Sequence, residues 1–150
     1  MKPGFNRRRL LKGMLAITAL ALAPLQLLAR NVPAFKASSS ADALKVLFGD
    51  KPVIESDQVK LKVPDIAENG AVVPVTVKTK MSGVKSITII VLENPNPLSA
   101  RFTLSPKVAA DISTRIKMGK SSDVLAAVET EDGIYVASKN VKVTIGGCGG

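Results

Sequence analysis

Val73-Pro74-Val75-Thr76-Val77-Lys78 carries an apolar side chain at every second position, the period of a half-buried β-strand. The later run Ile87 to Val91 is apolar on both faces because of Ile90 and Leu92, and this predicts a central strand. Pro74 favours an edge strand or a bulge for the run from Val73 to Lys78. The alternation also occurs at Val59 to Val63, Ile87 to Val91, Ala100 to Leu104, Ile112 to Met118 and Val141 to Ile145.

Turn signals such as Glu68-Asn69-Gly70, Asn94-Pro95-Asn96-Pro97 and Glu131-Asp132-Gly133 separate these runs at intervals of about 10 to 15 residues. Seven or eight short strands at that spacing predict an all-β fold, an antiparallel β-sandwich of immunoglobulin-like type. The segment Asp123 to Val128 is compatible with helix or strand. One short amphipathic helix is expected between Ser38 and Gly49, where it covers an edge of the core or docks on a partner.

The composition excludes several classes of site. The chain has 150 residues, one Cys and no His. A single thiol rules out an internal disulfide framework and multi-cysteine metal sites, and the lack of His removes the commonest general base and metal ligand. We therefore expect no metal site, no cofactor and no catalytic residue in this chain.

The formal charge of +9 is concentrated at the N-terminus. Residues 1–30 hold six basic and no acidic side chains, so residues 31–150 have a surplus of only three positive charges. Four aromatic residues beyond residue 30 are too few for the basic and stacking surface that single-stranded nucleic acid requires. Nucleic-acid binding is not expected.

The N-terminal segment is typical of an export signal, because a basic region precedes an apolar run from Leu10 to Ala29. The run is long enough for a membrane anchor, but Gly13 and Pro24 interrupt it, which favours cleavage. Arg7 and Arg8, followed by Leu10-Leu11-Lys12, match the twin-arginine motif better than a general secretion signal. The expected location is the periplasm, with no membrane attachment after cleavage.

The sequence ends in Gly146-Gly147-Cys148-Gly149-Gly150. Four glycines in five positions abolish side-chain packing and predict a flexible arm rather than a strand. The predicted organisation is an export signal over 1–34, cleaved between about residues 29 and 37, a sandwich over 35–145 and the arm over 146–150.

An unpaired thiol in an oxidising compartment is a liability unless it has a use, so Cys148 is the candidate functional group. No His or second Cys can assist it, and the C-terminal carboxylate two residues away opposes thiolate formation. The hypothesis is a carrier protein, not an enzyme, whose thiol is activated by the enzymes that bind the arm. The alternative is a structural or adhesive immunoglobulin-like module crosslinked through its cysteine.

The C-terminal Gly-Gly-Cys-Gly-Gly resembles the terminal signature of the SoxY family, the sulfur-carrier subunits of the periplasmic thiosulfate-oxidising system. Four inner runs also resemble that family, and the similarity spans essentially the whole chain. These runs are Ile66-Ala67-Glu68-Asn69-Gly70, Val73-Pro74-Val75, Glu93-Asn94-Pro95-Asn96-Pro97 and Arg115-Ile116-Lys117-Met118.

The resemblance implies that sulfur intermediates are bound covalently to Cys148, with Gly146, Gly147, Gly149 and Gly150 serving arm mobility and recognition. It also implies a heterodimer with a SoxZ-like subunit. Transient partners would be a SoxAX-like haem enzyme, a SoxB-like hydrolase and, in some systems, a SoxCD-like sulfane dehydrogenase, and all cofactors would belong to them. Asn94, Asn96 and Arg115 have ordinary turn or surface explanations.

Overall fold

The computed structural model describes residues 32–144, which form two β-sheets and two short helices. None of these residues belongs to a helix that is long and apolar enough to span a membrane. The elements are α2 (Val32–Phe35), α3 (Ser40–Phe48), β1 (Val53–Glu55), β2 (Lys60–Lys62), β3 (Ile66–Ala67), β4 (Val73–Lys78), β5 (Ser86–Val91), β6 (Leu98–Thr103), β7 (Asp111–Ile116), β8 (Ser122–Glu129) and β9 (Ile134–Val143).

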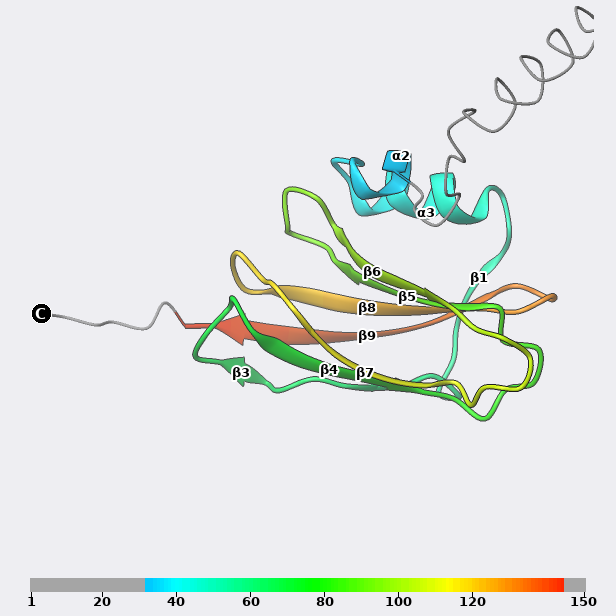
Figure 1. Cartoon of the computed structure of the whole chain (residues 1–150). Coiled ribbons are helices and arrows are strands. Elements are labelled where there is room, and N and C mark those ends of the chain that lie inside the picture. The colour runs from blue at the N-terminus through cyan, green and yellow to red at the C-terminus, as the bar shows by residue number, and fades with distance from the viewer. Residues whose placement is uncertain (1–31, 145–150) are drawn as a thin grey trace, which may run out of the picture. The chain divides into compact units, whose positions relative to one another are not determined.

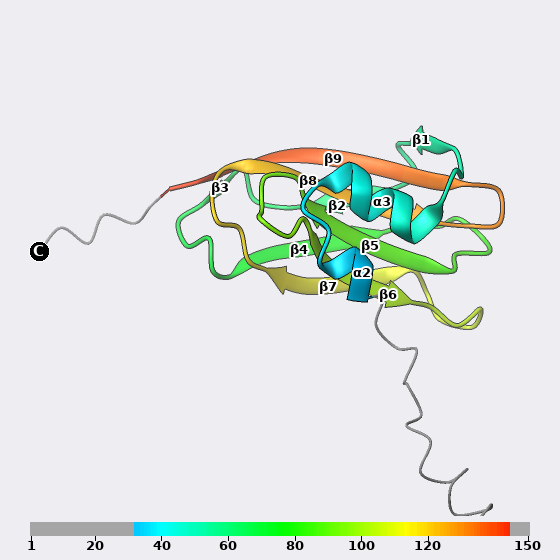
Figure 2. The same cartoon turned by 90° about the horizontal axis from the view of Figure 1, so that it is seen from above.

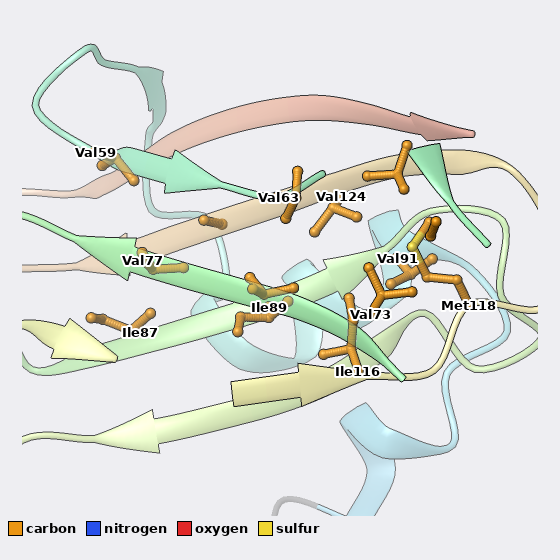
Figure 3. Close-up of a cluster of buried hydrophobic side chains, with 14 of the residues drawn as sticks. Val59, Val63, Val73, Val77, Ile87, Ile89, Val91, Ile116, Met118 and Val124 are labelled. Carbon is orange, nitrogen blue, oxygen red and sulfur yellow. The ribbon is translucent and has the colours of Figure 1, made fainter. Parts of the chain in front are cut away.

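The two sheets lie face to face (Figure 1). The larger sheet has the strand order β1-β9-β8-β5-β6, and β3 pairs with β9 outside this path. The smaller sheet has the order β2-β4-β7. Alternate residues of β4 and β5, among them Val77 and Ile89, meet between the sheets in one buried core (Figure 3). The sequence prediction of a sandwich is confirmed.

The helices cover the outer face of the larger sheet, as seen from the side and from above (Figures 1 and 2). Ala34 and Ala43 pack in a second cluster with Ile90 of β5 and Leu98 of β6, and all four side chains are buried. The Ser39 Oγ caps α3 by accepting a hydrogen bond of 3.0 Å from the Asp42 N–H. Gly49 ends the helix with a φ of 63°, a conformation that favours glycine.

The expected central strand is confirmed, because β5 lies between β8 and β6 and all six of its residues are buried. The prediction of an edge position or bulge at Pro74 is wrong, since β4 is the middle strand of its sheet. However, β2 pairs only with Thr76, Val77 and Lys78. Pro74 lies beyond the end of β2 and pairs with β7 alone, which explains why a residue without an N–H is tolerated there.

Further details differ from the sequence prediction. The ambiguous segment Asp123 to Val128 is a strand, within β8. The sheets are not wholly antiparallel, because β1 and β3 both pair with β9 in parallel. These two strands and α2 were not predicted, and β9 starts at Ile134, seven residues before the expected last run at Val141 to Ile145.

Candidate functional site

The predicted site residues Cys148, Gly146, Gly147, Gly149 and Gly150 lie outside the described residues, as do the export-signal residues Arg7 and Arg8. The structure does describe the end of the sandwich from which residues 145–150 continue. The sequence prediction for these residues therefore stays a prediction.

The end of β9 is held by backbone hydrogen bonds on one side and by a bond to a serine side chain on the other. The Lys142 N–H donates to the Asp65 carbonyl at 2.9 Å, and the Thr144 N–H donates to the Ala67 carbonyl at 3.0 Å. On the other side, the Val143 N–H donates to the Ser121 Oγ at 2.9 Å. Thr144 is thus fixed to the sandwich immediately before the residues that lead to Cys148.

Chain geometry limits where Cys148 can lie. Four Cα-to-Cα steps lead from Thr144 to Cys148, and an extended chain covers at most about 3.6 Å per step, so the two Cα atoms are no more than ~14 Å apart. We call the end of the sandwich at which Thr144 lies the tail end. It comprises residues 67–70, Asn94, residues 117–121 and residues 143–144.

Three loops are bonded to one another at the tail end. The Met118 N–H donates to the Gly70 carbonyl at 2.6 Å. The Asn94 Nδ2 donates to the Lys117 carbonyl at 2.7 Å, and its Oδ1 accepts from the Gly119 N–H at 3.0 Å. Val73 also lies opposite Ile116 in the β4–β7 pair. Four runs of sequence that were predicted as separate strands and turns therefore converge at the tail end, namely residues 66–70, 73–75, 93–97 and 115–118.

A hollow of about 440 Å³ opens beside these loops. Lys120 and Glu93 at its edge form an exposed ion pair of 2.9 Å. The hollow is lined by Ser38, Leu92, Glu93, Asn94, Pro95, Gly119 and Lys120. Ser121, which follows Lys120, bonds to Val143, so this hollow is adjacent to the end of β9.

Three residues expected to have only turn or surface roles, Asn94, Asn96 and Arg115, differ in their contacts. Asn94 connects two loops through both side-chain atoms. Asn96 is exposed in its turn, and Arg115 is exposed on β7 opposite Pro74. None of them forms a cluster of reactive groups in the part of the chain that the structure describes.

One charged cluster, which surrounds Glu129, was not predicted from the sequence. The Glu129 carboxylate accepts hydrogen bonds of 2.8 Å from the Lys51 Nζ, the Arg101 Nη2 and the Ser86 Oγ. Arg101 also stacks over Phe48 of α3, with its guanidinium carbon 5.1 Å from the ring centroid. The cluster joins the larger sheet to the helical layer at the end of β8 far from the tail end, so its role is structural.

Electrostatics at Glu129 reflect two opposed effects. Burial raises the pKa of the carboxyl, but the hydrogen bonds from Lys51 and Ser86 and the charges of Lys51 and Arg101 together hold the pKa below its usual value. Its partners are 78, 43 and 28 residues away in sequence, so no local pattern could have revealed them.

Residues 32–144 contain no group of three or more Cys, His, Asp or Glu side chains placed to hold a metal ion. At the tail end, the described part of the chain presents loops that are connected through Asn94 and a hollow edged by the ion pair of Lys120 and Glu93.

Comparison with known proteins gives consistent results. A family model described as "Sulfur oxidation protein SoxY" matches residues 44–148. The structure is similar to that of the sulfur carrier protein SoxY from Chlorobium limicola f thiosulfatophilum, with 39% sequence identity and a TM-score of 0.66. That match covers 72% of this chain and 98% of the other. No curated protein matches the chain.

Two other solved structures match more weakly. One is from a study of T cell activation by the bacterial superantigen toxic shock syndrome toxin-1, with 8% identity, a TM-score of 0.42 and coverage of 57% of this chain and 99% of that chain. The other is the BSP domain of a biofilm associated protein, with 17% identity, a TM-score of 0.39 and coverage of 67% and 17%. At these values neither bears on function.

Proposed function

Because the chain belongs to the SoxY family of sulfur oxidation proteins, we propose that it carries sulfur intermediates of thiosulfate oxidation covalently on the thiol of Cys148. The observation that carries this proposal is the family match over residues 44–148, which extends to the only cysteine of the chain. The similarity to a protein described as a sulfur carrier supports it.

The chemistry begins with oxidative coupling. The Cys148 thiol and thiosulfate form a sulfur–sulfur bond, the thiol proton is released, and two electrons pass to a haem enzyme, as the family resemblance implies. Water then cleaves the terminal sulfur–sulfonate bond in a hydrolase, which releases sulfate and a proton and leaves a persulfide on Cys148. This chain contributes the sulfur nucleophile, and the partners contribute the oxidant and the bases.

The tail end is suited to this role in two respects. Its loops are fixed by direct hydrogen bonds, so β9 starts the tail from a defined point. The covalent link keeps reactive sulfur near successive active sites, within ~14 Å of Thr144, at a high effective concentration. A carrier of this kind has no need of catalytic residues of its own.

The proposal includes partners and a location. A SoxZ-like subunit would form the heterodimer, and enzymes like SoxAX and SoxB, and in some systems one like SoxCD, would act on the tail in turn. Arg7, Arg8 and the following apolar run support twin-arginine export to the periplasm. Export of a folded chain would allow assembly with the partner subunit before transport.

The test is intact-mass analysis of the protein isolated from thiosulfate-grown cells, before and after treatment with a reductant, with peptide mapping of the adduct. We expect reductant-labile sulfur or thiosulfonate additions on the Cys148 peptide and none in a Cys148→Ser variant. A bare thiol, or only a stable disulfide to one protein, would contradict carriage and favour the crosslinked structural module.

A further inference from the structure

The smaller sheet has one buried and one uncovered face. Along β4, Val73, Val75 and Val77 are buried against the larger sheet, and the residues between them point outward. α2 and α3 cover the outer face of the larger sheet and leave that of the smaller sheet free, as the two views show (Figures 1 and 2).

This uncovered face is basic. All five of its charged residues are exposed. Four are positive and one is negative, so the face has a surplus of three positive charges, the same as residues 31–150 as a whole. We call it the basic face and define it by Lys60 and Lys62 of β2, Lys78 of β4, and Asp111 and Arg115 of β7.

The pairing of the strands brings like charges together. Lys60 lies directly opposite Lys78 across β2 and β4, an arrangement that is unfavourable for the isolated chain. Lys78 forms an ion pair of 2.8 Å with Asp111. Among the described residues, no carboxylate lies within ion-pair distance of Lys60, Lys62 or Arg115.

Lysines on the edge strand β2 also discourage sheet-to-sheet aggregation. That purpose also accounts for Arg115 on β7, the other edge strand, but not for Lys78 on the middle strand β4. Hydroxyl groups of Thr76 and Ser113, bonded to each other at 3.0 Å, lie between the charges and offer further polar contacts.

The basic face is hollowed at two places. A hollow of about 700 Å³ is lined by Lys60, Lys78 and Lys80, together with Asp57 and Asp111 and neighbouring residues. A second one of about 390 Å³ lies near the other end of β2. Its lining consists of Lys62, Val63, Pro64, Pro74 and Thr76. Acidic side chains of a partner could enter both hollows.

We propose that the basic face is the docking surface for an acidic region of a partner protein. Complementary charge would speed the encounter and fix the orientation of the two proteins. The face has no aromatic side chain for stacking on bases and no large apolar side chain for insertion into a membrane, so a protein is favoured over nucleic acid or lipid. Arg115 and Pro74 place one end of the face next to the tail end.

The experiment uses a fluorescently labelled peptide of about ten glutamates, a length that spans a strand face, and measures its anisotropy with the purified exported protein at low salt. The test variant combines Lys60→Glu, Lys62→Glu and Arg115→Glu. The control combines Lys36→Glu, Lys45→Glu and Lys107→Glu, which alters the net charge equally at exposed positions off the basic face.

We expect the test variant to lose at least tenfold in affinity and the control to lose less than threefold, with circular dichroism showing both to be folded. Amide NMR shifts caused by the peptide should fall on residues 60–62, 76–78 and 111–115. Equal losses in both variants, or the absence of binding, would overturn the proposal. So would an oligonucleotide of equal charge or an anionic vesicle that binds the same face more tightly. The outcome is independent of Cys148, so the carrier proposal stands or falls separately.

Discussion

Glu129 is the residue on which the contact between the larger sheet and the helical layer most depends. Its side chain is 12% exposed, and three donors enclose its carboxylate. If the buried carboxylate of Glu129 lost its charge, Lys51 and Arg101 would have no anion to pair with. Charged hydrogen bonds of this kind contribute about 1.5–3 kcal/mol each.

We predict that Glu129→Gln lowers the free energy of unfolding by about 2 kcal/mol at neutral pH, measured by urea denaturation. The pKa of Glu129 is lowered in the folded chain, so its stabilisation is present above the pKa of the unfolded carboxyl and is lost as pH falls through the folded value. The difference between variant and parent should therefore shrink in acid.

The control for this prediction is Glu131→Gln. Glu131 pairs with Lys85 at 3.3 Å, but its side chain is 78% exposed, so the loss should stay below about 0.5 kcal/mol. Similar losses at both sites, or a difference at Glu129 that does not change with pH, would refute the assignment of the cluster.

Gly70 is a second sensitive residue, because its backbone approaches the loop after β7. A Cβ added there would collide with the Met118 carbonyl oxygen and lie 2.9 Å from the Val143 Cγ1. We predict that Gly70→Ala costs about 1–3 kcal/mol of stability by urea denaturation. Gly119→Ala is the matched control, since its Cβ would meet only the Asn94 Oδ1 at 3.8 Å. A Gly70→Ala protein as stable as the control would contradict the close packing.

At the scale of elements, the loops of the tail end depend on Asn94. We predict that Asn94→Ala lowers the free energy of unfolding by about 2 kcal/mol, because two hydrogen bonds to the loop at residues 117–119 are lost. Hydrogen exchange at the Gly119 amide, which donates to Asn94, should become faster. Asn96→Ala is the control, since Asn96 is exposed in the same turn and should change stability little. Equal effects of the two substitutions would argue against the connecting role of Asn94.

The sequence predicted β4, β5 and α3 because the period of their side chains is local, whereas it left β8 open between helix and strand and missed the start of β9. The apolar pattern is alternating in β4, continuous in β5 and helical in α3, and each pattern can be recognised within a few residues. β1 and β3 have only three and two residues, too few for a period to be recognised. They become strands because the long β9 provides an edge with which they pair in parallel.

The candidate site was predictable to a similar extent. Cys148 is identified by its uniqueness and its glycine neighbours, which are properties of the sequence alone. The bonding of Asn94 to the loop at Lys117 and Gly119 depends on contacts 23 and 25 residues apart, and the fold alone brings them together. The basic face likewise arises from strand register, which places Lys60 opposite Lys78.

At the scale of the whole molecule, three features of the described residues lie on different parts of the sandwich. The helices cover the larger sheet, the basic face lies on the smaller sheet, and β9 leads to the tail at one end. This division allows a partner to contact the sandwich while it receives the tail. Any activation of the thiol would then come from that partner, because the chain contains no His and only one Cys.

This division leads to a prediction for the isolated protein. Without a His or a second Cys to assist it, Cys148 should remain mostly protonated at neutral pH, so its alkylation by iodoacetamide should still accelerate up to about pH 9. A Cys148→Ser variant, which lacks the single thiol of the sequence, is the matched control and should show no such alkylation. If the rate instead levelled off below pH 7, the chain would activate its own thiol, and the partners would have only to recognise it.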